Sequence, residues 1–526
     1  MFYWRIDLTQ GQIYTFSSAT DKIISAMPDG IEILAFISQD LPPQFVNAKN
    51  QLEDKLKEYD RLSGGKIKIS YIDPIKNSDY ESLAQSFGIP PLDLQVVEND
   101  QVQIKKAYFG LALVKNKSDQ SASSDQSNPL DEYEKYEVIP VVENINNFEY
   151  DIASKLLKVG SDQLPIIGFL TGHGEHSLMP PSQYANMATS DPRMDYPLRE
   201  DLSANYEIKT VDLGEYIKST EENKTNPLDG ISTLIVAGPQ QEIPEEQATI
   251  INDFIKNGGN AVMLIDQYDI NTQYGLIATP INYDFQNILK PLGVAINKSI
   301  IADNNSGTAT FNQGFISYSI PYPYFIKVTD LNRDNSITQD LESFILPWAS
   351  PIDYDSSDTS IIPLGVSSQV FTLMKEKEVS APAAPSTETD TTEGQPTSEQ
   401  TELKLEPISL DPEQDFGFTG TRKDPVTMAV MVERENQGKV VVIGDSDFVV
   451  QGGGNTTFFL NIVDSLSLGE DLIQIRSKGI TDRPLKDVSD TGKNSIRWGL
   501  TIGVPILFIL YGFYRRSIRN AMKKRI

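Results

Sequence analysis

The stretch from residue 165 to residue 176, PIIGFLTGHGEH, constrains the fold more than any other part of the sequence. Its first half is apolar, which predicts a buried β-strand over 165–170. The strand ends in the glycine-rich turn 171-TGHGEH-176, which holds both histidines of the chain. In open α/β sheets, ligands bind beyond the carboxyl ends of the strands. We therefore predict a ligand-binding turn made by Gly172, His173, Gly174 and Glu175.

The same turn carries side chains suited to a metal site, because imidazole and carboxylate groups are ligands of zinc and iron. The candidate ligands would be His173, Glu175 and His176. The pattern is not H-E-x-x-H, and the chain has no third histidine, so another carboxylate would have to complete the coordination. A non-metal binding pocket and a purely structural turn are the alternatives, and the sequence leaves all three open.

A second strand-end turn, 443-IGDSDF-448, follows another apolar run. Gly-Asp-Ser after a strand resembles the nucleophile block of GDS-type serine esterases, which need a histidine late in the chain as the base. No histidine follows His176, so Ser446 would depend on His173 or His176 folding back beside it. We predict instead a strand-end turn in which Asp445 and Ser446 cap the helix that starts near Asn455. We also expect this turn to flank the same crevice as the histidine turn, with Asp445 and Ser446 binding a ligand there.

Composition excludes several classes of function. The chain has 526 residues and a net charge of −28, which disfavours contact with nucleic acid phosphates. It has no cysteine, so disulfide frameworks, thiolate metal sites and cysteine nucleophiles are excluded. The phosphate-binding pattern G-x-x-x-x-G-K-[ST] is missing as well, so the chain does not hold ATP through such a loop. We expect no cofactor.

A charge-free run near the end of the sequence predicts one membrane-spanning helix. Residues 498–514 would form a helix of roughly 25 Å, close to the short limit for a bilayer. We place the helix at 496–514, after a juxtamembrane linker at 481–495. The tail at 515–526 is basic, so the positive-inside rule puts it in the cytoplasm and the acidic body outside. No translocation signal is visible at Met1, so we expect a hydrophobic segment upstream of this sequence.

Residues 1–160 predict a small α/β domain. The patterns favour the order β-α-β-α-β-β-β-α, which suggests a mixed sheet with helical cover. One continuous strand is expected over 102–114. The layout is thioredoxin-like, without the redox cysteine pair.

Residues 161–480 predict a larger domain with a mostly parallel, doubly wound sheet. Strands are expected at 165–170, 206–212, 231–237, 260–265 and 439–443, and helices near 197–204, 244–257 and 281–290. The segment 376–407 interrupts this pattern. It is rich in Ser, Thr, Pro and Glu, so we expect a disordered insertion there.

A series of short motifs runs through nearly the whole chain: 5-RIDLTQGQIYTFSSAT-20, 67-IKISYIDP-74, 168-GFLTGHGEH-176, 320-IPYPYFIKV-328, 345-ILPWASPI-352, 440-VVVIGDSDFV-449, 455-NTTFFLNIVDSL-466 and 473-IQIRSK-478. Their order resembles the GldG-type auxiliary subunits of bacterial ABC transporters, a group that includes gliding-motility-associated proteins and uncharacterized ABC-type transport systems.

The resemblance implies a non-catalytic subunit anchored in the bacterial inner membrane, with a periplasmic body, working beside a separate ATPase and permease. It implies a class I amidotransferase-like fold for 161–480, of the GIFT-domain kind for which saccharide binding has been proposed. Without cysteine, glutaminase chemistry is ruled out. The rival hypotheses are a hydrolase using Ser446 with His173, a metal enzyme using the histidine turn, and an assembly scaffold without a pocket.

Overall fold

The computed structural model describes most of the chain between residues 16 and 468. The described residues are 16–98, 101–117, 129–142, 148–161, 163–176, 178, 198–219, 224–271, 276–313, 316–380, 403–418, 422–451, 453–468 and a few positions between 497 and 515. The expected juxtamembrane linker lies outside these residues, and so do most positions of the expected membrane helix and basic tail. Within the described part of the chain, no helix combines the length and apolar character needed to cross a bilayer.

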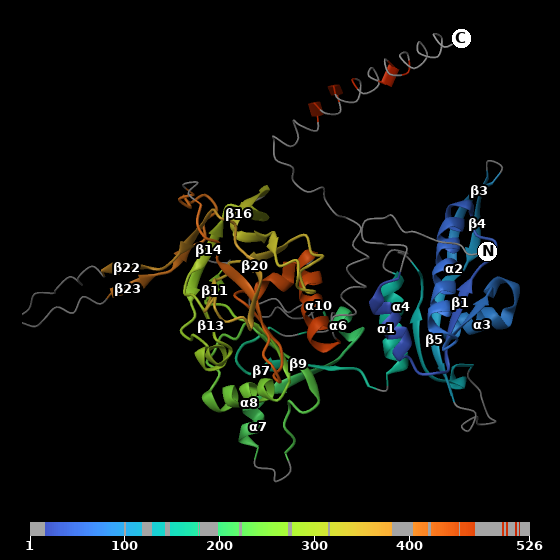
Figure 1. Cartoon of the computed structure of the whole chain (residues 1–526), viewed down its shortest axis with the longest axis horizontal. Coiled ribbons are helices and arrows are strands. Elements are labelled where there is room, and N and C mark those ends of the chain that lie inside the picture. Colours follow the sequence, from blue (N-terminus) through green and yellow to red (C-terminus); the bar gives the residue numbers. More distant parts are fainter. Residues whose placement is uncertain are drawn as a thin grey trace, which may run out of the picture. The chain divides into compact units, whose positions relative to one another are not determined.

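The N-terminal part is built on a four-stranded sheet in the order β2-β1-β5-β6 (Figure 1). Its strands are β1 (Ile31–Ile37), β2 (Ile67–Ile72), β5 (Phe109–Asn116) and β6 (Tyr133–Ile139). β1 pairs in parallel with β2 and antiparallel with β5. The sequence of β1, IEILAFI, is apolar on both faces, as a central strand covered from both sides requires.

Helices cover both faces of this sheet. Leu52 of α2 (Pro43–Ser63) packs in one core with Ile33 of β1, and α1 (Ser18–Ala26) and α4 (Phe148–Gly160) join that core. Ala84 of α3 (Ser78–Ser86) packs with Phe36 on the opposite face. The result is a mixed α/β layer structure in which β1 is the buried centre.

The single strand expected over 102–114 is wrong, because two strands in different sheets occupy it. β4 (Gln101–Ala107) pairs with β3 (Leu92–Glu98) in a separate hairpin, and β5 begins at Phe109. Tyr108 lies between them, where its N–H donates to Ser38 Oγ at 2.9 Å and its carbonyl accepts from Ser38 N at 3.1 Å. These bonds tie the break to the end of β1, a long-range contact that sequence periodicity does not reveal.

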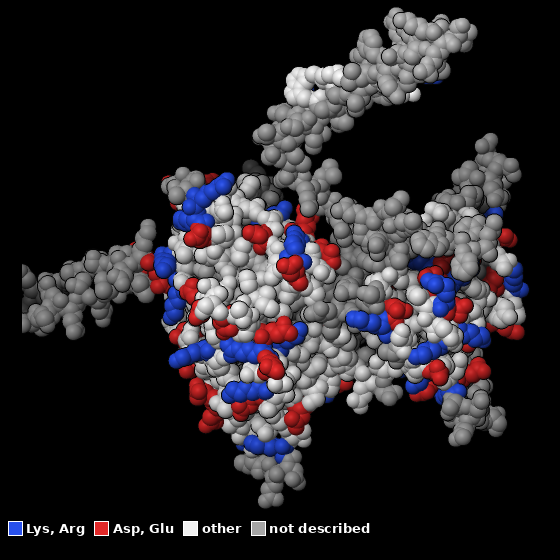
Figure 2. Space-filling model, viewed as in Figure 1, with Lys and Arg blue, Asp and Glu red and all other residues white. Residues whose placement is uncertain are grey.

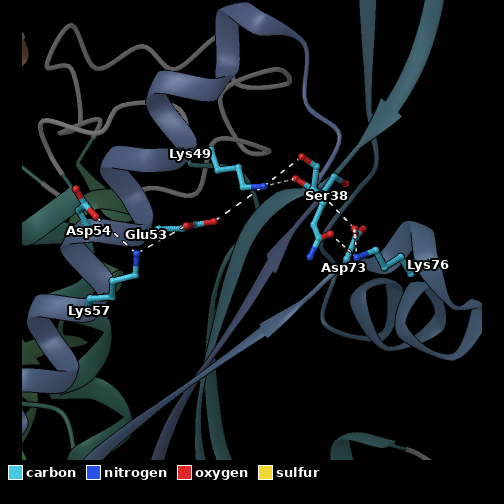
Figure 3. Close-up of polar contacts among 8 residues, drawn as sticks. Ser38, Lys49, Glu53, Asp54, Lys57, Asp73 and Lys76 are labelled. Carbon is cyan, nitrogen blue, oxygen red and sulfur yellow. Dashed lines mark hydrogen bonds and ion pairs between the residues drawn. The ribbon is translucent and has the colours of Figure 1, made fainter.

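A polar network joins α2 to the carboxyl ends of β1 and β2 (Figure 3). Lys49 Nζ reaches the carbonyl oxygens of Ser38 and Gln39 at 3.5 and 3.2 Å, and lies 4.0 Å from Glu53. The Gln39 N–H donates to Asp73 Oδ2, directly after β2, at 3.1 Å. The polar groups of this strand edge are therefore largely satisfied within the domain.

The larger part of the chain is built on an eight-stranded sheet in the order β17-β20-β25-β26-β10-β9-β7-β8. Its strands are β7 (Ile166–Thr171), β8 (Glu207–Asp212), β9 (Ile231–Ala237), β10 (Asn260–Leu264), β17 (Asp330–Leu331), β20 (Ile361–Val366), β25 (Thr427–Val432) and β26 (Val440–Ile443). The adjacent strands β8, β7, β9, β10 and β26 pair in parallel along the sheet. In chain order these five strands read 2-1-3-4-5, an arrangement found in doubly wound sheets.

Each face of this sheet has its own apolar core, because alternate side chains of a strand point to opposite faces. Val441 and Ile443 of β26 pack with Phe458 of α10 (Gly454–Ser467), and α6 (Arg199–Ser203) adds to that core. Val440 and Val442 pack in the second core, on the side of α7 (Leu213–Lys218), α8 (Glu245–Lys256) and α9 (Gln286–Leu289). Helical cover on both faces leaves the strand ends as the accessible edges.

The expected mostly parallel sheet is confirmed, because the five predicted strands pair in parallel. β25, β20 and β17 extend it antiparallel beyond β26. Two other expectations for this part need correction. The helix expected over 281–290 shrinks to α9, because β12 (Ile277–Pro280) ends at Pro280 and Phe285 takes a left-handed conformation (φ +51°) just before the helix. The ends of the insertion at 376–407 pair as the strands β22 (Lys377–Ser380) and β23 (Leu403–Glu406). Residues 381–402 of that insertion lie outside the described residues.

The excursion between β10 and β25 supplies several smaller sheets and turns. The remaining elements of the described residues are β11 (Tyr268–Asn271), β12 (Ile277–Pro280), β13 (Val294–Ile296), β14 (Ile300–Asp303), β15 (Ser306–Gln313), β16 (Ile316–Val328), β18 (Phe344–Pro347), β19 (Ile352–Tyr354), β21 (Phe371–Met374), β22 (Lys377–Ser380), β23 (Leu403–Glu406), β24 (Ile408–Ser409) and the 3₁₀ turns η1 (Pro74–Lys76), η2 (Pro129–Glu132), η3 (Lys290–Leu292) and η4 (Asp447–Gln451).

Figure 2 shows acidic and basic side chains interspersed over the face in view, so the negative charge does not gather into one patch there.

Candidate functional site

The turn after β7 is closed on itself and on the end of β9. The ring nitrogen Nδ1 of His173 lies 2.8 Å from Glu175 Oε1, and the His173 backbone N–H donates to Glu175 Oε2 at 2.7 Å. The His173 carbonyl accepts from the N–H groups of Gln240 and Gln241 at 2.8 and 3.0 Å. Both side chains of the His173–Glu175 pair are nearly buried. The pair therefore fixes the shape of the turn.

Two glycines allow this turn to form. Gly172 and Gly174 have φ angles of +113° and +80°, in the left-handed region that a side chain disfavours. A Cβ atom at Gly174 would also lie 3.2 Å from Gln240 Cβ. The backbone conformation of the turn therefore requires glycine at these two positions, independently of any ligand.

His176 leaves this turn and faces the turn after β26. Its backbone N–H donates to the carbonyl of Ala237, at the end of β9, at 2.8 Å. Its side chain is buried, and Nε2 lies 3.1 Å from Ser446 Oγ and 3.7 Å from Asp447 Oδ1. The carboxyl ends of β7, β9 and β26 are therefore joined through this one residue.

Asp266, two residues after β10, holds the β26 turn from the other side. The Ser446 backbone N–H donates to Asp266 Oδ1 at 2.7 Å, and the Ser446 hydroxyl donates to Asp266 Oδ2 at 2.5 Å. Both residues are buried. A carboxylate that accepts two bonds from one residue fixes that residue in a single orientation.

Gly444 lets the β26 turn approach the neighbouring backbone. A Cβ atom at this position would lie 2.0 Å from the carbonyl oxygen of Ser350, closer than any two such atoms can come. The Ser350 N–H donates to the Gly444 carbonyl at 2.8 Å. The glycine of the 443-IGDSDF-448 motif is thus required by close packing.

Asp445 is the least satisfied acidic side chain at this edge. The residue is 2% exposed, and its Oδ1 accepts from the Asp447 N–H at 3.0 Å. Its Oδ2 has no hydrogen-bond partner among the described residues. Burial raises the pKa of the Asp445 carboxyl well above its ordinary value, and the nearby carboxylates of Asp447 and Asp266 raise it further. An unpartnered, buried carboxylate oxygen costs free energy unless a proton or a cation meets it.

Three carboxylates converge at the same point. One oxygen each from Asp266, Asp445 and Asp447 lies within 4.8 Å of the others, a spacing that one metal ion can bridge. Beside them, Gln267 is 2% exposed, and both polar atoms of its amide lack a hydrogen-bond partner among the described residues. This edge concentrates buried polar atoms that the described part of the protein does not satisfy.

The contacts around Ser446 differ from those of a Ser-His-Asp triad. In a triad the histidine accepts the serine proton, and the carboxylate orients the histidine. Here the single hydroxyl proton of Ser446 goes to Asp266, so His176 Nε2 meets the lone pairs of Ser446 Oγ as a donor. Ser446 is fully buried as well. The arrangement orients and locks the serine; it does not activate it.

A cavity of about 590 Å³ lies away from this edge. It is lined by Gly230 and Ile231 at the start of β9 and by Asn260 at the start of β10. These residues mark the amino ends of β9 and β10, opposite the carboxyl edge of the sheet that carries the acidic group. The cavity is therefore not part of the candidate site.

The structure divides the predicted binding residues into two groups. Asp445 and Ser446 meet His176 and Asp266, while the predicted histidine-turn residues form the closed turn beside them: Gly172, His173, Gly174 and Glu175. Sequence reasoning missed Asp266 and Asp447. Asp266 follows the apolar run 261–265, so a search for polar residues directly after buried strands would have found it.

Comparisons with known proteins bear on the same region. The family described as ABC-type uncharacterized transport system matches residues 164–461, and a domain of unknown function (DUF7088) matches residues 10–114. An uncharacterized protein of Borreliella burgdorferi is 26% identical over 383 residues, which cover 72% of this chain and 67% of that protein.

Two solved structures share weaker likeness. The N-terminal domain of mmIFT52 is 13% identical with a TM-score of 0.34, over 57% of this chain and 96% of that one. A ThuA-like protein from Parabacteroides merdae is 9% identical with a TM-score of 0.27, over 62% of this chain and 94% of that one. The family match, by contrast, spans more than half of the chain and contains every residue of the candidate site. The protein therefore belongs to the family described as ABC-type uncharacterized transport system.

Proposed function

We propose that this chain is a non-catalytic accessory subunit of an ABC-type transport complex and that its eight-stranded sheet binds a polar ligand at the carboxyl edge. Membership of the family supports a role as an accessory part of such a system. An ATPase and a permease would be the other subunits, because the chain has no phosphate-binding loop of its own.

The same proposal anchors the protein in the inner membrane by residues 496–514, with the body in the periplasm. The support is sequence chemistry: a charge-free run at 498–514 followed at once by a basic tail.

The finer fold assignments belong to this proposal too. The four-stranded sheet covered on both faces agrees with a thioredoxin-like domain, and the 2-1-3-4-5 strand order agrees with an amidotransferase-like one.

One observation carries the ligand-binding part. At the carboxyl edge of the parallel strands, beyond β10 and β26, Asp445 and Gln267 bury polar atoms that lack partners among the described residues. A polar ligand, such as a saccharide, would supply those partners, with the turn from Gly172 to Glu175 as the adjoining wall. A hydrolase is the second candidate, but the bond from the Ser446 hydroxyl to Asp266 disfavours it.

Purification of the tagged chain from detergent-solubilised membranes tests the complex. We expect an ATPase and a multi-span permease to co-purify, and we expect a variant truncated before residue 496 to leave the membrane fraction. Recovery of the intact chain in the soluble fraction, without an ATPase, would contradict the proposal.

Substitution and labelling test the binding edge. If His173→Ala and Glu175→Ala leave the transport phenotype intact, the histidine turn is structural. A fluorophosphonate probe that labels Ser446 would restore the hydrolase hypothesis, and we expect none, since the serine is buried and its proton is held by Asp266.

A further inference from the structure

We propose that the carboxyl edge of the eight-stranded sheet binds one divalent metal cation through carboxylate oxygens of Asp266, Asp445 and Asp447, with His176 beside them. The inference rests on the proposed binding role of this edge and names the class of its ligand. It differs from the metal site considered from the sequence, because His173 and Glu175 are engaged with each other.

The geometry suits one ion. Ligand oxygens lie about 2.0–2.6 Å from magnesium or calcium, so two oxygens on opposite sides of one ion are about 4–5 Å apart. The three carboxylates of Asp266, Asp445 and Asp447 each place an oxygen within 4.8 Å of the others. They come from the ends of two neighbouring strands, β10 and β26, which the sheet holds in fixed register.

The ligand residues are held in place before any ion arrives. Asp266 is fixed by two bonds from Ser446, at 2.7 and 2.5 Å. Asp445 is fixed through its Oδ1 by the Asp447 N–H at 3.0 Å. Such outer contacts orient carboxylates in metal sites.

The unpartnered oxygen of Asp445 is a second observation that points to a ligand, based on hydrogen bonding and not on the spacing of the carboxylates. Asp445 is 2% exposed, and its Oδ2 has no hydrogen-bond partner among the described residues. A carboxylate so deeply buried, with two other carboxylates facing it, is satisfied by a cation more completely than by the hydrogen bonds to Oδ1 alone.

The donor set selects the type of ion. Carboxylate oxygens suit magnesium, calcium and manganese. Manganese is therefore the informative probe, because its spectroscopic signal reports binding directly.

Titration of Mn²⁺ into the full-length chain, purified in detergent and treated with a chelator, tests the inference by electron paramagnetic resonance. We expect saturation at one ion per chain, and at least about tenfold weaker binding in Asp445→Asn, which keeps the shape of the side chain but removes its charge. The matched control is Asp269→Asn, an exposed aspartate on β11, which should bind as the unmodified chain does.

Two results would overturn the inference: no saturable binding by the unmodified chain, or equal binding by Asp445→Asn. If Asp445→Asn fails to fold, Asp447→Asn gives the same test, because the Asp447 side chain is 33% exposed and tolerates change better. Co-purification of an ATPase and a permease is scored separately. Lost metal binding with an intact complex rejects this inference alone, and a missing complex with intact metal binding rejects the proposed transport role alone.

Discussion

Gly444 shows how one residue at the candidate edge is set by its neighbours. A methyl group there would meet the Ser350 carbonyl oxygen at 2.0 Å, so the two backbones would have to separate. We expect Gly444→Ala to lower the free energy of unfolding by about 2–3 kcal/mol, as overpacking does. Urea denaturation followed by circular dichroism measures the change.

The control for this substitution is Gly214→Ala in α7. A Cβ atom there would lie 3.3 Å from the flexible Gln247 side chain, and alanine favours a helix. We expect no loss of stability in this variant. Equal stability of Gly444→Ala and the unmodified chain would mean that the close approach to Ser350 is not real.

Asp151 on α4 gives a prediction about pH. Burial raises the pKa of its carboxyl to about 6, although Lys155 lowers it in part. In the unfolded chain this carboxyl ionises near pH 4. The folded state favours the protonated carboxyl, so the stability that this preference gives is present below about pH 4 and is lost as pH rises through about 6. We expect Asp151→Asn to raise the free energy of unfolding by on the order of 1–2 kcal/mol at pH 7, after allowance for solvent screening, and by almost nothing at pH 4.

Urea denaturation at both pH values measures this difference. The exposed Asp269→Asn variant serves as the control and should show no gain that depends on pH. A gain for Asp151→Asn that is the same at pH 4 and pH 7 would mean that charge burial is not its cause.

At the scale of elements, Asn455 fixes the start of α10. Its amide nitrogen donates to the carbonyls of Ile345 and Phe448, both at 2.8 Å, and its Oδ1 accepts from Ile345 N at 2.7 Å. We expect Asn455→Ala to cost about 3 kcal/mol, because buried backbone groups of β18 and η4 lose their partners. Thr456→Ala, one residue along, should stay within about 0.5 kcal/mol in the same thermal and urea melts. A loss of equal size in both variants would show that the cost comes from the helix itself.

The elements that the sequence predicts best are the parallel strands. Strands buried on both faces read as continuous apolar runs, so β7, β9 and β10 lie where the runs at 165, 231 and 260 placed them. β20 was missed because Pro363 and Gly365 interrupt its pattern, and the structure has register irregularities at those two positions.

The candidate site was harder to predict than the strands that carry it. A strand-end turn containing Asp445 and Ser446 is visible in the sequence, since the polar residues follow an apolar run. Their meeting with Asp266 depends on β10 and β26 being neighbours, and the bonded residues are 180 positions apart. Local pattern carries no information on such a pairing, so the sequence left open whether His173 or His176 meets Ser446, and the structure places His176 there.

For the whole molecule, the insertion between β22 and β23 is predicted to be dispensable for folding. Ser380 and Leu403 are register partners, so a two-residue Asn-Gly turn can replace residues 381–402. A shorter loop costs less entropy to close, so we expect the free energy of unfolding to stay unchanged or rise by at most about 2 kcal/mol. The thermal midpoint should then stay unchanged or rise as well. Calorimetry of the shortened chain measures this, and a clear drop in the midpoint would show that the replaced residues make stabilising contacts.

The separation of the paired strand ends also has a consequence for the time course of folding. Asp266 and Ser446 are 180 residues apart, and His176 and Ser446 are 270 apart. At a synthesis rate of about 5–20 residues per second, β26 is synthesised roughly 10–40 seconds after β10 and Asp266. During that interval the edge of β10 that later pairs with β26 has no partner strand and can associate with other chains. Synthesis of β26 is therefore the step that completes the parallel sheet and brings the acidic residues together, and folding intermediates formed before it would lack Asp445 and Asp447.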